Sequence, residues 1–303
     1  MGDLPINLST ERFERATDFL LANARLLERR LYDVHFRDGP KEAVTSSVGA
    51  YRNRDGGLGW GLEPDTTSPE SQPLFTIMGL ESLRQVGALD AMLLQNSLPY
   101  FESVLTDEGG IPWMFWPSGR YPRADHFENV SERATIAATA PVLALCIEFG
   151  VVRPWMKVAE TFVWREMARQ GDDHAMCAAC MKRRAAFLAQ RTSEARGARE
   201  IEALRLRVSS DAVLCTDPAE ADWGLYGHPS SVSYAPSPDS LLRGAFSMHR
   251  IDEDLDTLIE RQCTDGRWAT NYGISERTRL DWDGIYTLES LLTLRAYGRI
   301  VDE

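Results

Sequence analysis

Acidic side chains gather at two places in the sequence where their spacing suits proton or metal chemistry. Asp281 and Asp283 flank a tryptophan at the expected start of an apolar helix. Two carboxyl groups held close together cannot both ionise easily, so one of them keeps its proton. The alternative is structural: Asp281 caps the helix, and Asp283 is a first-turn acid whose pKa the helix dipole lowers.

A second acidic cluster is formed by Glu63 and Asp65, with Glu70 shortly before another expected helix. Oxygen-rich clusters suit Mg²⁺ and a bound diphosphate, and a carboxylate pair suits acid and base work around a sugar bond. Turn formation and helix capping explain the same residues. Both interpretations of Glu63 and Asp65 stay open at this point.

Aromatic residues are frequent in the expected loops and helix starts. Ring faces in a cavity stabilise carbocations or stack on sugars. The residues that we expect to line such a cavity and bind substrate are Trp116, Trp223, Trp282 and Tyr286. Trp60 and Trp268 are instead expected to act as structural clamps between helical hairpins.

His174, Cys177 and Cys180 follow one another at steps of three residues, which places them on one face of an expected helix. They are either zinc ligands or part of a packed stripe, in which buried cysteine is common. The chain holds five cysteines, an odd number spread over a long sequence, and this does not indicate a disulfide framework. We therefore expect reduced, mostly buried thiols.

The elements that must position these residues are helices. Mostly apolar helices are expected at about 74–86, 132–149, 174–190, 240–247 and 284–297, and more polar helices lie between them. Strand-like alternation is almost absent. Hairpins of one apolar and one polar helix bury the apolar member only by stacking on further copies. The pattern favours an all-α fold, a single domain over residues 1–303 in which five or six hairpins close into a ring.

Composition narrows the classes of function. Of the 303 residues, 44% are hydrophobic, enough for a substantial core, and the formal net charge is −12. An acidic chain is not expected to bind nucleic acid or anionic lipid, since both need clustered Lys and Arg. No window has the apolar length of a membrane span, and the first residues lack the pattern of a secretory signal. We expect a cytoplasmic protein, and its oligomeric state stays open.

Residues 262–268 read Gln-Cys-Thr-Asp-Gly-Arg-Trp and match Q-x-x-x-G-x-W, the core of a helix-hairpin repeat. Residues 52–60 and 106–113 look like partial copies that keep an aspartate, the glycines and a terminal tryptophan. The chain thus resembles squalene-hopene cyclases and related prenyltransferase-type proteins, which are α/α-toroids, and most closely uncharacterised bacterial single-domain members. The resemblance implies the toroid fold and leaves the reaction open.

Class II terpene cyclases carry D-x-D-D, whose middle aspartate protonates an alkene or epoxide. Here Asp281 and Asp283 keep the first and third positions, and Gly284 takes the fourth. The resemblance implies that Asp283 donates the proton, that Asp281 assists it, and that a small apolar isoprenoid of secondary metabolism is cyclised in a central cavity. That mechanism requires no cofactor, although Mg²⁺ would suit a diphosphate.

Two further functions stay open beside this one. The first is a carbohydrate-active toroid, a hydrolase or lyase, that uses paired carboxylates from Glu63, Asp65 and Asp281 or Asp283. The second is a non-catalytic toroid whose cavity holds a ligand.

Overall fold

The computed structural model describes residues 6–115, 121–128, 131–169, 177–210, 214 and 229–301. Of the described residues, 59% are in helices. Within these ranges β-pairing occurs only as isolated bridges and forms no strand, as the sequence predicts. None of the helices is long and apolar enough to cross a lipid bilayer within the described residues.

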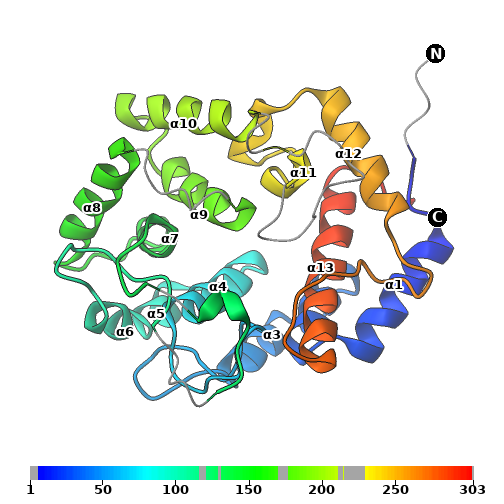
Figure 1. The fold of residues 1–303 in the computed structure, drawn as a ribbon, viewed down its shortest axis with the longest axis horizontal. Coiled ribbons are helices and arrows are strands. Elements are labelled where there is room, and N and C mark those ends of the chain that lie inside the picture. Colours follow the sequence, from blue (N-terminus) through cyan, green and yellow to red (C-terminus); the bar gives the residue numbers. More distant parts are fainter. Residues whose placement is uncertain are drawn as a thin grey trace.

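The helices follow one another around a ring, and several helices that are consecutive in the chain pack on each other (Figure 1). The first half contains α1 (Thr10–Asn23), α2 (Leu26–Phe36), α3 (Lys41–Gly49), α4 (Pro73–Gln85), α5 (Ala91–Gln95), α6 (Leu98–Ser103) and the short η1 (Asp125–Phe127). The second half contains α7 (Ile136–Glu148), α8 (Met156–Arg169), α9 (Ala178–Ala189), α10 (Ala195–Val208), α11 (Ser231–Tyr234), η3 (Leu241–Ala245), α12 (Met248–Glu260) and α13 (Glu276–Ala296).

The ring closes where the last helix meets the first. Helix α13 packs against α1 and α2, and the Leu8 amide donates a 2.8 Å hydrogen bond to the Arg299 carbonyl. The loop after α12 adds a second link, because the Gln262 side chain donates to the carbonyls of Arg12 and Gly266. Gly266 has φ of 92°, and a Cβ atom there would lie 2.2 Å from the Arg15 backbone. Only glycine fits this approach to α1.

Helices α4, α7, α9 and α13 lie nearer the centre of the ring, and α1, α8, α10 and α12 lie outside them (Figure 1). Helix α7 shows the reason most clearly, since every residue from Ile136 to Cys146 is buried. It packs on α4, α8 and α9 at once. The amphipathic α12 instead buries one face, through residues such as Ile251 and Leu255. An inner helix such as α7 is thus buried on all sides, whereas an outer helix such as α12 is buried on one side only.

Helix α13 differs from the expectation in a way that bears on the chemistry. It begins at Glu276 and not at Asp281, because Ser275 caps it in a capping box with Thr278. Asp281 and Asp283 therefore lie in the second turn and at the start of the third. The predicted capping role of Asp281 is wrong, and the dipole of the first turn does not act on Asp283.

Three other local predictions also differ. The helical spacing of apolar residues predicts one helix from about residue 10 to 36, but the chain breaks it at Ala24 and Arg25, whose extended backbone separates α1 from α2. The helix expected at 240–247 is the short 3-10 turn η3. Trp60 is not a clamp: it is 59% exposed and donates only to Asn53, on its own loop. Trp268 is 5% exposed, and its indole donates to the Leu258 carbonyl at 2.7 Å.

Candidate functional site

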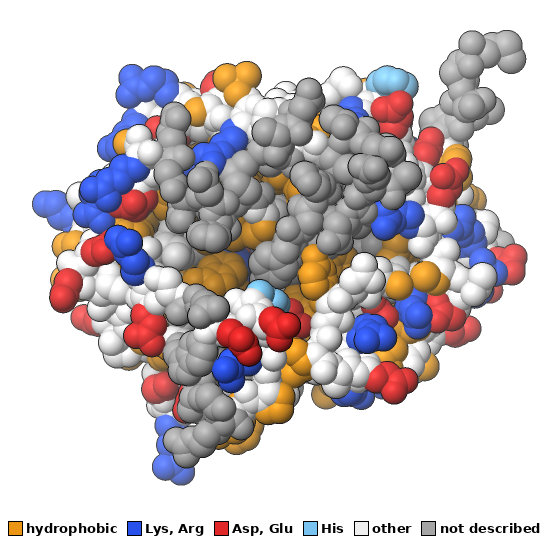
Figure 2. All heavy atoms as spheres, viewed as in Figure 1, with side chains coloured by type: hydrophobic (Ala, Val, Ile, Leu, Met, Phe, Trp, Pro, Cys, Tyr) orange, Lys and Arg blue, Asp and Glu red, His pale blue; other side chains and the backbone are white. Residues whose placement is uncertain are grey.

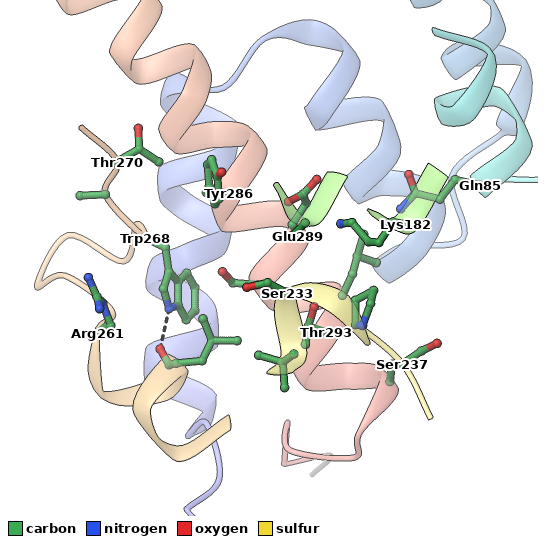
Figure 3. A pocket seen from close by; sticks show the side chains of 18 of the residues that line it. Gln85, Lys182, Ser233, Ser237, Arg261, Trp268, Thr270, Tyr286, Glu289 and Thr293 are labelled. Atoms are coloured by element: carbon green, nitrogen blue, oxygen red, sulfur yellow. Dashed lines mark hydrogen bonds between the residues drawn. The ribbon is translucent and has the colours of Figure 1, made fainter. Parts of the chain in front are cut away.

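Two neighbouring cavities lie among the inner helices. The larger cavity, about 600 Å³, lies between α4, α9, α11 and α13, with Trp268 and Tyr286 in its wall (Figure 3). The smaller cavity, about 450 Å³, lies between α2, α4, α9 and α13, and Glu63, Trp113 and Trp282 line it. Both share a wall formed by Arg84, Gln85, Lys182, Glu289 and Leu292. Figure 2 shows hydrophobic side chains near the middle of one face, beside acidic ones.

Glu63 and Asp65 are buried acids near these cavities, with 2% and 1% of their surface exposed. They share a tight turn in which the Asp65 amide donates to Glu63 Oε2 at 2.9 Å. Burial raises the pKa of Glu63 well above its usual range, and the nearby charge of Asp65 raises it further. Burial also raises the pKa of Asp65. Glu63 Oε1 and Asp65 Oδ2 make no hydrogen bond, which favours the protonated form of each.

Trp282 joins this turn to α13. Its indole nitrogen donates to Asp65 Oδ1 at 2.8 Å, although the two residues are 217 positions apart. Trp282 is 1% exposed and packs beside Tyr272 and Tyr286, with ring centroids 5.8 and 6.2 Å away. The structure therefore brings together four of the predicted site residues, Glu63, Asp65, Trp282 and Tyr286.

His126 completes this group, although no pattern around it assigns it a role. Its Nε2 lies 3.5 Å from Asp65 Oδ2, and its side chain is partly exposed. The loop before α7 is held there by the Ala124 amide, which donates to the Asp65 carbonyl at 2.7 Å. The proximity of His126 lowers the pKa of Asp65, against the effect of burial. We call Glu63, Asp65, His126 and Trp282 the Asp65 cluster.

Asp283 is buried as well, but both of its oxygens have polar neighbours. Oδ1 accepts from the Thr270 amide at 2.7 Å and from the Thr270 hydroxyl at 3.2 Å. Arg267 Nε lies 3.5 Å from Oδ2. Burial raises the pKa of Asp283, whereas the Thr270 bonds and Arg267 lower it. These contacts tie the loop after α12 to α13, and they suit an ionised carboxylate.

Asp281 has a different set of neighbours from Asp283. Its carboxylate lies 3.3 Å from Arg277 Nε, one helical turn away. Burial raises its pKa, and the charges of Arg25 and Arg277 lower it. Side chains two positions apart on a helix point in widely different directions, so Asp281 and Asp283 do not form a carboxyl pair.

Gly284 explains why a fourth acid is missing from the Asp281 segment. A Cβ atom at Gly284 would lie 2.7 Å from the Ala24 Cβ, at the junction of α1 and α2. An aspartate there would push α13 away from the first hairpin, so the position serves helix packing.

The remaining predicted site residues are not placed. Trp116 and Trp223 lie outside the described residues, as does His174. Within the described part of the chain no three His, Cys, Asp or Glu side chains form a group that could hold a metal ion.

Comparisons with known proteins give fold neighbours and no sequence family. No family model matches the sequence, and no curated protein matches it. The type II terpene cyclase MstE from Scytonema, in complex with geranylgeranyl dihydroxybenzoate (substrate), aligns with a TM-score of 0.54 at 15% identity. That alignment covers 96% of this chain and 97% of MstE.

Two further structures give the same result. MstE in complex with merosterolic acid A (product) aligns with a TM-score of 0.55 at 15% identity, over 96% of this chain and 97% of that one. A protein from Actinoplanes aligns with a TM-score of 0.55 at 12% identity, over 95% of this chain and 99% of that one. The chain therefore has the fold of the type II terpene cyclases, which are α/α-toroids.

Proposed function

We propose that this protein is an enzyme that cyclises a prenylated substrate in its central cavities, as a class II terpene cyclase does, with an aspartic acid as proton donor. The observation that carries the proposal is Asp65, a buried carboxyl whose Oδ2 makes no hydrogen bond, beside packed aromatic rings. The fold neighbour MstE, solved with a prenylated substrate and its product, supports this choice of substrate class. The arrangement of the helices also supports a toroid of five or six hairpins.

Asp65 has the features that a proton donor to a carbon–carbon double bond needs. Burial raises its pKa and so keeps a fraction of it protonated. Trp282 fixes Oδ1, which leaves Oδ2 to carry the proton. Transfer of that proton to an alkene carbon leaves a carbocation on the substrate and a carboxylate on Asp65. Trp282 and His126 then stabilise the carboxylate, and loss of a proton from the cyclised cation completes an isomerisation.

The aromatic residues supply the second requirement, a surface that stabilises cations and excludes water. Trp113 and Trp282 line the smaller cavity, and Tyr286 lines the larger one. The negative faces of such rings stabilise a carbocation that water would otherwise quench. Trp116 and Trp223 remain predicted members of this surface.

Asp283, the donor that the D-x-D resemblance implies, remains the second candidate. Its bonds with Thr270 and its position beside Arg267 favour the ionised form. Asp65 Oδ2 makes no hydrogen bond and has a histidine, His126, 3.5 Å away in place of an arginine, and for this reason we place the donor there. Asp281, next to Arg277, is a less favourable donor for the same reason as Asp283.

The wall shared by the two cavities indicates a substrate with one polar end. Arg84, Lys182 and Glu289 lie on this wall, opposite apolar surface from α2 and α13. A prenyl chain suits the apolar surface, and an anionic head group suits Lys182 and Arg84. Protonation itself needs no metal, and Mg²⁺ enters the proposal only if that head group is a diphosphate.

The test is to incubate the purified protein with geranylgeranyl dihydroxybenzoate and with farnesyl and geranylgeranyl diphosphates, with and without Mg²⁺. Products are extracted and identified by mass spectrometry. We expect a cyclic isomer of at least one substrate, and a loss of about 10²-fold to 10⁴-fold in Asp65→Asn, since a positioned general acid contributes that much. Circular dichroism shows whether the variant is folded. If no substrate is cyclised, or if folded Asp65→Asn keeps full turnover, the proposal is wrong.

A further inference from the structure

Cys177 and Cys180 form a close pair at the start of α9. Cys177 is the N-cap residue of the helix, and its sulfur accepts from the Cys180 amide at 3.3 Å. The two sulfurs are 2.8 Å apart. A disulfide needs about 2.05 Å between the sulfurs, so a small movement of the side chains joins them.

The surroundings of Cys177 favour the thiolate, which is the reactive form of the thiol. Its hydrogen bond with Cys180 is the main reason that its pKa is lowered to about 7, against the effect of burial. Arg183 and Lys182 of α9 add positive charge nearby. The start of a helix also stabilises an anion, because its free amide groups point outward there.

The neighbouring helices add no negative charge that outweighs this. On α4, Glu81 is paired with Arg183 at 2.8 Å, and that guanidinium also lies 5.2 Å from the Trp113 ring centroid. On α11, Tyr234 has its pKa raised by burial, so the phenol stays neutral. On α7, the contact is the apolar Ala137.

Only one residue of the pair lines the smaller cavity. Cys177 is in the wall of that cavity and Cys180 is not, although both are buried, at 9% and 7% exposed, in one small apolar cluster with Ala137. A small reagent that enters the cavity therefore meets Cys177 first. Cys180 is positioned to attack the product of that first reaction.

We propose that Cys177 and Cys180 are a redox-active dithiol that small-molecule disulfides oxidise through the smaller cavity. The Cys177 thiolate attacks one sulfur of the reagent RS–SR, forms a mixed disulfide and releases RS⁻. The Cys180 thiolate then attacks Cys177 Sγ, which forms the protein disulfide and releases the second RS⁻. The two thiol protons end on the two RSH products, and two electrons pass from the protein to the reagent.

The other described cysteines provide internal controls. Cys146 is fully buried on α7, and burial raises its pKa to about 12. Cys263 is partly exposed in the loop after α12. Neither stands at a helix start next to a second sulfur. The proposal therefore assigns reactivity to one pair among the described cysteines and not to exposure alone.

The test uses the folded full-length chain and cystamine, a small disulfide that fits the cavity. We expect the intact protein to lose two hydrogens, and peptide mapping to place the new disulfide between Cys177 and Cys180. Dithiothreitol should reverse the change. In Cys180→Ser the reaction should stop at a cysteamine adduct on Cys177, and in Cys177→Ser neither product should form at Cys180. Cys263→Ser should behave as the unchanged protein does.

Alkylation of the unchanged protein provides a measurement that needs no variant. The rate of reaction of Cys177 with iodoacetamide should reach half its maximum near pH 7. If cystamine forms no Cys177–Cys180 disulfide in the unchanged protein, or modifies Cys263 in preference, the pair is only a packing contact and the proposal fails. The outcome does not depend on whether the protein cyclises a terpenoid.

Discussion

The Asp65 cluster and the Asp283 segment contain the same kind of side chain at similar burial, yet they suit different tasks. Asp65 and Asp283 are each 1% exposed. Asp283 accepts two hydrogen bonds from Thr270 at Oδ1 and has an arginine, Arg267, 3.5 Å from Oδ2, whereas Asp65 accepts from Trp282 at Oδ1 and has a histidine, His126, 3.5 Å from Oδ2. Burial beside an arginine makes a structural anchor, and burial without one keeps a proton available. The chemical role that a buried acid can take therefore depends more on its partners than on its position in a motif.

The largest effect that tests the difference between Asp65 and Asp283 is on turnover. We expect Asp65→Asn to reduce cyclisation about 10²-fold or more, because it removes the proton donor. Asp283→Asn should keep turnover within about threefold, since it keeps the shape of the anchor. Product formation by both purified variants, each checked for folding, measures the ratio. The reverse ranking would assign the donor role to Asp283, as the D-x-D resemblance implies.

The second effect is on stability, and here we expect Asp283 to matter more than Asp65. Asp283→Ala leaves the buried Thr270 amide without its partner and removes one of the two carboxylates beside Arg267, so we expect it to lower the free energy of unfolding by about 2–4 kcal/mol. Denaturant titration measures this change. Asp265→Ala is the matched control, because Asp265 is solvent-exposed on the same loop and pairs only with Arg267. Equal losses in the two variants would contradict the anchoring role.

The third effect sharpens the role of Trp282. Its bond to Oδ1 lowers the pKa of Asp65, so Trp282→Phe should raise that pKa further. A donor works only while it is protonated, and turnover falls as the pH rises through its pKa. The pH at which the unchanged protein loses half its turnover on the basic side should therefore move upward in the variant. A profile that moves downward or stays fixed would argue against Asp65 as the titrating acid.

The smallest effect concerns Glu63. Because its pKa is raised in the folded chain, the folded state holds this proton more tightly than the unfolded state does. The stability that this proton contributes is complete below the unfolded pKa of about 4.3 and is lost as the pH rises toward the folded pKa. Glu63→Gln removes this dependence. Its free energy of unfolding should fall less than that of the unchanged protein between about pH 4.5 and 7, as thermal or urea unfolding will show.

The sequence predicts the inner helices well because their signal is local. Helix α7 is apolar over its whole length, and α4 begins at Pro73 as the pattern indicates. The sequence misplaces the start of α13 because the first turns of this helix are polar and expose their outer face. The helical spacing of apolar residues therefore begins to show only at Trp282. The Ser275 cap, six residues before Asp281, is the available signal.

The site is predicted only in part, because its contacts join residues that are far apart along the chain. Glu63 and Asp65 stand out as acids near a helix start, and Trp282 and Tyr286 stand out as aromatics one turn apart. Nothing local indicates that Trp282 donates to Asp65 or that His126 lies beside it, since 217 and 61 positions separate these pairs. Such contacts arise when the ring closes. A pattern of helices predicts that the ring closes, but not which residues then meet.

Closure of the ring also has a topological consequence. The backbone near both ends of the chain meets at Leu8 and Arg299, so the first and last helices are neighbours in space (Figure 1). A short linker between these ends should allow circular permutation, with new ends opened in the loop between α7 and α8, whose residue Val152 is exposed. The order of the helices around the cavities, and hence the geometry of Asp65, would then survive a change in where the chain starts.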